Sequence, residues 1–483
     1  MDAIQSIKAA ASHLTPEIVL LIGGSLVMSA SVFQRKRERE DVHSDRSMYA
    51  AASLICLLLA MLTSFWRGVP QLAPDAFGLF RFDATALASE RLTFLGGLIL
   101  ILMSWSTAPK GRMAEYYGAL LIILAAIPIV GASNDLVSLF LGLELVSIPT
   151  YVLLGIVKSD NTGLEAALKY FMLSAFASCF FLLGISYLYG FCGSTNLMVI
   201  QAGFGEGKRL MALGLLLAMC GLAFRITAVP FHFYAPDVFD GTSVTLAGAM
   251  SYLPKVAGFV ALIRLIGAGT LSQGASSVIV PVLLVCAALT MCIGNVLAVA
   301  QNNLRRMMAY SSVAHTGYLL LALVALIRQD ANANVLFSYL AAYAAMTLGM
   351  FACLGEIEAA GGKSHLIGDL AGMFYRRPAA SIGLTVALIS LIGLPLTAGF
   401  WAKFMVFVGV VADRRVDSIS LIMGVLMAFN AVIAAGYYWR VLSTLYSKSV
   451  SDVPLRVFRP SLFVAYTICT VLTILWFFVP ASM

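Results

Sequence analysis

Long apolar stretches recur along nearly the whole chain, and no other feature restricts its fold as strongly. A helix of about 20 apolar residues crosses the hydrocarbon core of a bilayer, which is about 30 Å thick. We expect about fourteen membrane-spanning helices, at approximately 16–33, 49–66, 88–106, 117–133, 136–156, 164–190, 209–230, 242–268, 277–300, 304–325, 333–355, 380–409, 418–445 and 460–481. Hydrophobic residues make up 60% of the chain and charged residues 11%, against about 45–50% and about 25% in soluble domains. The sequence therefore predicts an all-α polytopic membrane protein with lipid as its solvent.

The sequence shows little sign of cofactor chemistry. The eight cysteines are scattered, mostly within apolar runs, and none forms a CxxC pair, so we interpret them as small core residues. No glycine-rich phosphate loop, HExxH motif or nucleophile elbow occurs in a fitting context. The basic residues form no run long enough to suggest nucleic-acid binding. We expect no cofactor or metal on this chain, and we expect any redox chemistry to belong to other chains.

The distribution of lysine and arginine predicts an orientation. These residues are about twice as frequent in the loops after odd-numbered spans, and the positive-inside rule places those loops in the cytoplasm. With an even number of spans, both termini then lie on the non-cytoplasmic side. The first apolar run, Ile18 to Phe33, lacks a small-residue cleavage site before the charged loop. We therefore interpret it as a retained span and not as a signal peptide.

Two of the expected spans look interrupted. The seventh runs into Pro230 and Pro236 just past a charged residue, and the twelfth contains Pro395 and Gly399 just before one. Proline removes an amide hydrogen bond and clashes with the preceding turn. A membrane tolerates this only where protein or water satisfies the freed backbone groups. Interrupted helices in corresponding parts of two halves are typical of inverted-repeat transporters with a site near the midplane.

Three ionisable residues fall deep inside expected spans. Glu144 lies near the middle of the fifth span, Lys255 near the centre of the eighth, and Lys403 just after the break in the twelfth. A charged residue at a helix centre costs about 3 kcal/mol on insertion scales, so such a residue usually serves a task. Lys255 is too far from either helix end to snorkel to the interface. Because burial disfavours its charged form, Lys255 is suited to carry protons, as is Lys403.

Further ionisable residues accompany these three. Arg225 lies deep in the seventh span, Lys169 near the start of the sixth, His232 just after Pro230, and His315 inside the tenth. Histidine suits a proton relay because it titrates near neutrality, but a histidine on a packed helix is equally well explained as a core residue. Lys169 is equally well explained by snorkelling. A row of ionisable groups on adjacent helices would give protons a path through hydrocarbon, since each charge affects the proton affinity of the next.

Two other charged residues have structural explanations that we favour. Arg264 lies near the end of the eighth span, where we expect its side chain to snorkel to the membrane surface. Asp237 directly follows Pro236, where we expect it to cap a helix. The alternative is that Asp237 lines a water path beside His232.

Five ordered motifs resemble the antiporter-like membrane subunits of respiratory complex I, namely LGLELVSIPTYVLLG, EAALKYFMLSAFAS, AVPFHFYAPDVFDG, NNLRRMMAYSSVAHTGYLL and LPLTAGFWAKF. Within that group the chain is most similar to the subunit N family of the bacterial proton-translocating NADH:quinone oxidoreductase. The resemblance implies two inverted five-helix repeats, each with a discontinuous helix. It places N-terminal helices at 1–115, an antiporter-like core at 116–410 whose second repeat continues to about 445, and C-terminal helices at 411–483.

The same resemblance implies proton pumping driven by quinone reduction in neighbouring subunits. Glu144, Lys255 and Lys403 match the family's glutamate of span five and lysines of spans eight and twelve. Lys169 and His232 also fall in matching motifs. Protons would enter from the cytoplasm, pass through Lys255 and leave by way of Lys403. The implied partners are the other membrane and peripheral subunits of complex I, which would hold NADH, FMN, iron–sulfur clusters and quinone, at the inner membrane of a bacterial cell.

One position departs from the family pattern, because Arg225 stands where lysine is usual. Arginine is effectively always protonated, so we expect Arg225 to pair with Glu144 as a fixed charge; otherwise this chain pumps weakly or not at all. Two other functions stay open, a subunit of a multisubunit cation/proton antiporter and a structural subunit that has lost transport. Sister subunits of complex I fit less well, since the chain ends soon after its last span and carries Lys403 where one sister has glutamate.

Overall fold

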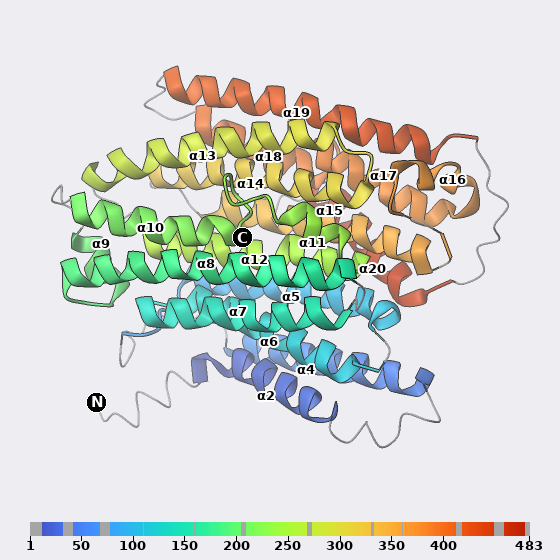
Figure 1. The fold of residues 1–483 in the computed structure, drawn as a ribbon, viewed down its shortest axis with the longest axis horizontal. Helices are drawn as coiled ribbons and strands as arrows, with labels where there is room; N and C mark the ends of the chain where they lie inside the picture. Colours follow the sequence, from blue (N-terminus) through green and yellow to red (C-terminus); the bar gives the residue numbers. More distant parts are fainter. Residues whose placement is uncertain are drawn as a thin grey trace. The chain divides into compact units, whose positions relative to one another are not determined.

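The computed structural model describes residues 12–31, 42–67, 78–109, 111–157, 161–203, 209–267, 273–329, 333–359, 361–362, 364–411, 418–448 and 458–478 (Figure 1). Over these ranges, β-structure is limited to three isolated bridges. The helices are α2 (Thr15–Ser29), α4 (Val42–Arg67), α5 (Ala84–Thr107), α6 (Met113–Ala132), α7 (Leu136–Val157), α8 (Asn161–Cys192), α9 (Leu197–Ala202), α10 (Arg209–Arg225), α11 (Ala235–Asp240), α12 (Val244–Ile266), α13 (Gln273–Val299), α14 (Leu304–Gln329), α15 (Asn334–Ala359), α16 (Met373–Arg376), α17 (Pro378–Ile392), α18 (Ala398–Val411), α19 (Ser418–Leu445) and α20 (Pro460–Phe478), with a 3-10 helix η2 at Ile367–Leu370.

The helices confirm the predicted fold class. In the part of the chain that the structure describes, eleven helices are long and apolar enough to cross a membrane, and four shorter apolar helices accompany them. The shorter ones are α2, α10, α17 and α18. When α17 and α18 are taken as two pieces of one span, the number of spans agrees with the fourteen that hydropathy predicts. The protein is therefore an all-α polytopic membrane protein.

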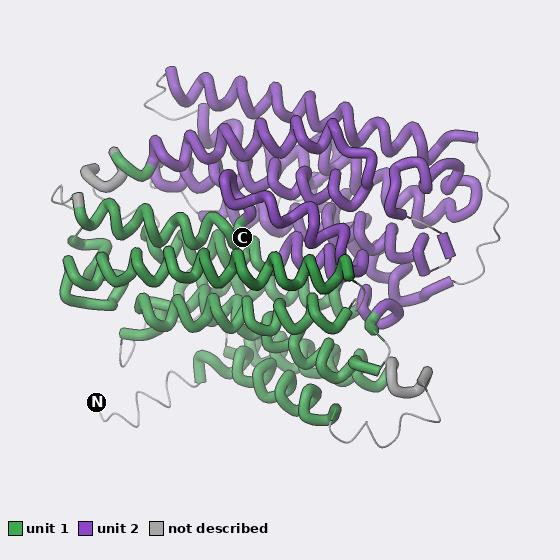
Figure 2. The backbone as a smooth tube through the Cα atoms, in the orientation of Figure 1, with its two compact units in different colours: residues 1–101, 108–226, 253–279 green, residues 102–107, 227–252, 280–483 purple. Residues whose placement is uncertain are grey.

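The chain forms two compact units that alternate along the sequence (Figure 2). Unit 1 comprises residues 1–101, 108–226 and 253–279, and unit 2 comprises residues 102–107, 227–252 and 280–483. In unit 1, α6 packs against α2, α4 and α7, and α8 packs against α7 and α10. In unit 2, α15 packs against α17, α18 and α20, and α14 packs against α11 and α18.

Glycines allow α8 and α10 to approach closely in unit 1. A Cβ atom at Gly184 would lie 2.3 Å from the backbone nitrogen of Ala218, and one at Gly221 would lie 2.7 Å from the carbonyl oxygen of Ala177. Helices within a bilayer gain little from hydrophobic exclusion, so close packing of small residues is a main source of their association. This crossing fixes the end of α10, one turn after Gly221, where Arg225 lies.

The two units contain the same local elements in the same order. Asp135 caps α7 by accepting backbone N–H bonds of 2.8 and 3.3 Å, and it forms a β-bridge with Asn196, which directly precedes α9. Asn303 caps α14 by accepting backbone N–H bonds of 3.0 and 3.2 Å, and it forms a β-bridge with Leu366, which directly precedes η2. A side-chain cap satisfies amide groups that a helix start otherwise leaves without partners. The recurrence supports the predicted internal repeat.

Both predicted helix breaks are present. Residues 226–234 separate α10 from α11, and residues 393–397 separate α17 from α18. Each break contains one non-glycine residue in the left-handed backbone region, Thr227 with φ 58° and Leu396 with φ 71°, which is costly for side chains of this kind. The sets α6–α12 and α13–α19 each contain five spans. Because five is odd, the second set enters the membrane from the opposite face, as an inverted repeat requires.

Candidate functional site

Arg225 and Glu144 form an ion pair between α10 and α7. The Nη2 atom of Arg225 donates to the Oε1 atom of Glu144 at 2.7 Å. The Nη1 atom donates to the Leu143 carbonyl at 2.9 Å and to the Ser147 hydroxyl. The Ser178 hydroxyl of α8 donates to the same Glu144 oxygen at 2.7 Å. The pairing predicted from the sequence is present, and three helices hold it.

The local sequence explains this arrangement. Leu143, Glu144 and Ser147 lie within about one turn of α7, so they present a carbonyl, a carboxylate and a hydroxyl to one neighbour. A guanidinium group carries five N–H donors in a rigid plane and can bind several acceptors at once. Arg225 is also the last residue of α10, where the helix dipole favours a positive charge. These contacts hold the guanidinium group and the carboxylate together in one geometry.

Glu144 lies on the exposed side of α7. Val137, Leu141 and Ile148 are 50%, 60% and 58% exposed, and their spacing places them on the same helix face as Glu144. The exposed fraction of the Glu144 side chain is 21%, compared with 9% for Arg225. One side of the ion pair thus reaches the outer surface of this chain, within an apolar stripe.

Lys255 is buried at the middle of α12. The residue is 2% exposed, and the most apolar part of α12 lies wholly inside the protein. Pro254 directly precedes it within the helix. Because proline has no N–H, it leaves the carbonyl group of Met250 without its intrahelical donor. A polar backbone atom is therefore available about one turn from the lysine.

Lys403 binds the C-terminal end of α17, at the break before α18. Its Nζ atom donates to the carbonyl oxygens of Leu391 and Ile392, both at 2.8 Å. The last carbonyl groups of a helix lack intrahelical donors and carry partial negative charge, so the break in the span creates a binding site for a cation. Gly393, with φ 90°, ends α17, and a Cβ atom there would lie 2.9 Å from the Lys403 side chain. The site therefore requires glycine at this position.

The ring of Tyr318 contacts Lys403, and two asparagine side chains extend this contact through hydrogen bonds. Its Nζ atom lies 5.1 Å from the ring centre of Tyr318, a cation–π contact. The amide of Asn295 donates to the Tyr318 hydroxyl at 3.4 Å and to the Oδ1 atom of Asn430 at 3.0 Å. The Tyr437 hydroxyl donates to Asn295 at 3.2 Å. We did not predict this network from the sequence, although two asparagines inside apolar spans were a visible signal.

His315 lies in a group of tyrosines in unit 2. It is 2% exposed, and its Nδ1 atom lies 2.9 Å from the hydroxyl of Tyr339. The rings of Tyr318 and Tyr343 are 5.7 and 5.3 Å from the imidazole. The Tyr343 hydroxyl in turn donates to Ser312 at 2.9 Å. The His315–Tyr339 and Tyr343–Ser312 hydrogen bonds therefore lie next to each other, with ring contacts between them.

Comparison with known proteins agrees with this arrangement of residues. Residues 133–433 match the family described as "NADH:quinone oxidoreductase/Mrp antiporter, TM". This chain belongs to that family. The matched region contains both helix breaks, the Glu144–Arg225 pair, Lys255 and Lys403.

Individual members of the family are similar over most of the chain. NADH-quinone oxidoreductase subunit N 1 of Solibacter usitatus is 34% identical over 442 residues, which cover 90% of this chain and 87% of the relative. A chain of respiratory complex I from Thermus thermophilus has a TM-score of 0.78 and 29% identity, with 95% of this chain and 97% of that chain covered. A chain of the Mrp complex from a Dietzia species has a TM-score of 0.81 at 19% identity, covering 97% and 94%, which shows a shared fold. The predicted relation to the antiporter-like subunits of complex I is confirmed.

Lys169 and His232, which also fall in the family motifs, lie apart from the residues described above: one is near the surface and the other is in a helix break. Lys169 forms an ion pair with Glu165 of the preceding turn at 2.7 Å, and the exposed fractions of the two side chains are 42% and 62%. This exposure favours the alternative in which Lys169 lies toward the surface. His232 lies in the break between α10 and α11, and its Nδ1 atom is buried with no hydrogen-bond partner in the described ranges.

Asp237 forms an ion pair and does not provide the predicted cap. Its Oδ1 atom accepts from Arg306 at 2.7 Å, and the start of α11 has no side-chain cap. Arg306 also donates to Asp240 at 3.1 Å, and Asn303 donates to Asp240 at 2.8 Å. Two carboxylates three residues apart lie on one helix face, so they bind a basic residue of α14 together. These contacts anchor α11, the short helix that follows the break after α10, to α14.

Arg264 does not snorkel, contrary to our prediction. Its guanidinium group binds both oxygens of Asp83, at 2.7 and 2.8 Å, and the carbonyl of Gly131 at 2.6 Å, and the residue is 6% exposed. Burial alone would raise the pKa of Asp83, but Arg264, the Ala86 amide and Arg81 hold that pKa below its usual range. A bidentate partner inside the protein outweighs the attraction of the membrane surface.

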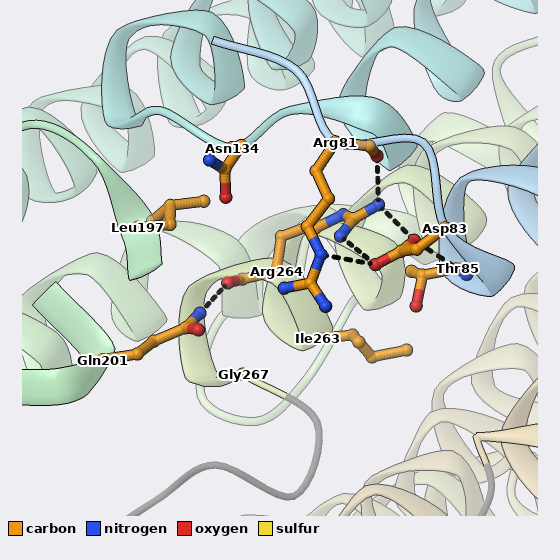
Figure 3. A pocket seen from close by; sticks show the side chains of 9 residues that line it. All are labelled: Arg81, Asp83, Thr85, Asn134, Leu197, Gln201, Ile263, Arg264 and Gly267. Atoms are coloured by element: carbon orange, nitrogen blue, oxygen red, sulfur yellow. Dashed lines mark hydrogen bonds and ion pairs between the residues drawn. The ribbon is translucent and has the colours of Figure 1, made fainter. Parts of the chain in front are cut away.

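The same residues line a small polar pocket in unit 1 (Figure 3). Figure 3 shows the Asp83 carboxylate bound by the guanidinium groups of both Arg81 and Arg264. Gln201 donates to the backbone carbonyl of Arg264 at 2.7 Å. The lining residues are Arg81, Asp83, Thr85, Asn134, Leu197, Gln201, Ile263, Arg264 and Gly267. Their charges are engaged in joining α5, α6 and α12, so we assign this pocket a structural role.

Metal-binding chemistry finds no support in the described ranges. There, no three His, Cys, Asp or Glu side chains lie close enough together to hold a metal ion. All eight cysteines are free thiols.

Proposed function

We propose that this chain is a membrane subunit of a proton-translocating NADH:quinone oxidoreductase and transfers protons through its buried ionisable residues. Membership of the family and the similarity to subunit N of other bacteria support the assignment to this complex. The observation that carries the transport function is the burial of Lys255 and Lys403, at 2% and 8% exposure, beside a helix proline and a helix break. NADH, FMN, iron–sulfur clusters and quinone would bind to the other subunits.

Lys255 and Lys403 are the residues that we assign to proton transfer. Lysine can exist in a neutral form when it is desolvated. The partners of Lys403 are two backbone carbonyl groups and the face of the Tyr318 ring, none of which is a base near neutral pH. They stabilise a proton on Nζ without competing for it. His315, His232 and, at the surface, Lys169 would assist the transfer.

The Glu144–Arg225 pair would respond to a neighbouring subunit. Glu144 is partly exposed within the apolar stripe of α7, and a carboxylate facing hydrocarbon is costly. We infer that another membrane subunit of the complex covers this face. A charge that moves in the neighbour would then shift the pair, and the pair would transmit the change electrostatically without passing a proton through Arg225.

The orientation and domain limits complete the proposal. The chain would lie in the bacterial plasma membrane with both termini on the non-cytoplasmic side, as the lysine and arginine distribution predicts. The N-terminal helices would occupy 1–115, the antiporter-like core 116–410 with its second repeat continuing to about 445, and the C-terminal helices 411–483.

Replacing Lys255 by alanine tests the proposed function. We expect NADH-driven proton pumping in membrane vesicles to fall at least about tenfold, since loss of a positioned proton-transfer group costs about 10² or more in rate. Quinone reductase activity that is coupled to pumping should fall with it, while the subunit stays in the complex. Lys448→Ala, at an exposed lysine after α19, is the control. Sodium/proton exchange without an electron donor would instead favour a cation/proton antiporter subunit.

Replacing Arg225 by lysine tests the fixed-charge role. Lysine keeps the positive charge beside Glu144, so NADH-driven pumping should be preserved or should increase. It loses the contacts to Leu143 and Ser147 that the guanidinium group makes, so a small loss of thermal stability should accompany the change. A clear loss of pumping in a fully assembled complex would contradict the role that we assign to Arg225.

A further inference from the structure

Four polar side chains form a cluster in the N-terminal helices of unit 1. Glu17 lies in the first turn of α2, Arg67 is the last residue of α4, Glu90 lies near the start of α5, and His13 precedes α2. Glu17 and Glu90 are 3% and 2% exposed. These helices precede both repeats, and the proton-transfer residues proposed above do not include them.

Arg67 joins the members of this cluster. Its Nη2 atom donates to the Oε2 atom of Glu90 at 2.5 Å, and its Nη1 atom donates to the backbone carbonyl of His13. The ring of His13 stacks on Phe82 with 4.9 Å between the ring centres. Glu17 interacts electrostatically with both Glu90 and Arg67. The two carboxyl groups and the guanidinium group therefore share one buried space.

The charges of the cluster do not balance if both glutamates are ionised. Among the described residues of the cluster, Arg67 supplies one positive charge against two negative charges. Partial burial and the nearby Arg67 lower the pKa of His13, so this imidazole is neutral at pH 7 and supplies no second positive charge. Arg264 binds Asp83, the acidic residue that precedes Glu90 in the sequence, and is not available to the cluster. A buried charge without compensation is strongly unfavourable.

Buried atoms without hydrogen-bond partners gather at the same place. Considering the described residues, these atoms are Oε2 of Glu17, Oε1 of Glu90, Nε of Arg67 and Nδ1 of His13. Two buried carboxyl oxygens without a donor destabilise the folded chain. A proton on one carboxyl group would supply a donor and would also remove the surplus negative charge.

We propose that Glu17 and Glu90 hold one proton between them, which makes this cluster a proton-binding site outside the antiporter-like core. Glu90 forms an ion pair with the guanidinium group of Arg67. Glu17 forms no such pair among the described residues, so it carries the proton. The reaction is simple protonation, in which the Glu17 carboxylate takes one proton from water and becomes a neutral acid. This inference does not depend on the transport function proposed above.

Infrared absorption of the purified complex tests the proposal, because protonated carboxyl groups absorb where ionised carboxylates do not. At pH 7 we expect a carboxylic acid band that shifts in D2O and is lost in Glu17→Gln. Glu165→Gln is the matched control, since Glu165 is 62% exposed, and it should leave the band unchanged. A band that survives in Glu17→Gln would overturn the proposal.

Thermal unfolding provides a second readout. Glutamine has the shape of a neutral glutamic acid, so Glu17→Gln should assemble and keep the Tm of the wild-type complex. Glu90→Gln removes the anionic partner of Arg67 and should lower the Tm. Two results would refute the proposal. The first is failure of Glu17→Gln to assemble. The second is a Tm that rises with added NaCl or KCl in the wild-type complex but not in Glu17→Gln, since a metal cation would then neutralise the two glutamates.

Discussion

Replacing Lys403 by arginine should leave the complex assembled but lower NADH-driven proton pumping at least about tenfold. Arginine keeps the positive charge, so it can still bind the carbonyl groups of Leu391 and Ile392 and face the ring of Tyr318. It cannot release its proton, because the guanidinium group stays protonated in proteins. The substitution therefore separates the structural contribution of the charge from its role in proton transfer.

The rate of proton uptake or release by vesicles, normalised to subunit content, is the appropriate measurement for Lys403→Arg. Arg328→Lys is a matched control, since Arg328 lies near the end of α14 and donates to Ser420 at 2.7 Å, and it should pump at the wild-type rate. Lys403→Ala should lose both pumping and some stability, because the end of α17 loses its cation. Wild-type pumping by Lys403→Arg would mean that Lys403 acts only as a fixed charge.

Replacing Glu144 by alanine should prevent stable assembly of this subunit. Arg225 is buried and its fixed charge would lose its carboxylate partner, which typically costs about 3–5 kcal/mol. This is a large part of the stability of an ordinary protein domain, about 5–15 kcal/mol. The amount of subunit in purified membranes and the Tm of the complex measure the effect.

The double variant Glu144→Ala with Arg225→Met distinguishes loss of charge balance from loss of contacts. It removes both charges and places an apolar side chain where the arginine was, so assembly should recover. Pumping should remain low, since the electrostatic link to the neighbouring subunit is gone. If the double variant is as unstable as Glu144→Ala alone, the single change does not act through the unpaired charge.

The sequence was sufficient to predict those features whose free-energy cost depends on the residues within one span. The spans follow from the length of the apolar runs, and the two breaks follow from prolines and glycines within them. Glu144, Lys255 and Lys403 stand out because each is expensive in an apolar run. The pairing of Glu144 with Arg225 follows because a buried fixed cation needs an anion, and the structure contains that pair.

Features that depend on partners distant in sequence could not be predicted. Arg264 was expected at the membrane surface, but Asp83, 181 residues earlier, holds it inside. Asp237 was expected to cap a helix, but Arg306 of another helix binds it. Nothing in the apolar run around Lys403 indicated that its partners are two backbone carbonyls, since every residue has one. Roles that rest on such contacts become visible only once the helices are packed.

The contact between Lys403 and the C-terminal end of α17 also bears on how the two pieces of the span are held together. Residues 393–397 join the two pieces of this span, and the ammonium group on one piece attracts the carbonyl groups that end the other. If Lys403 releases its proton, as we propose, this attraction should weaken, and it should be restored when the proton returns. Under that proposal, the protonation state of one side chain would be coupled to the geometry of a broken membrane span.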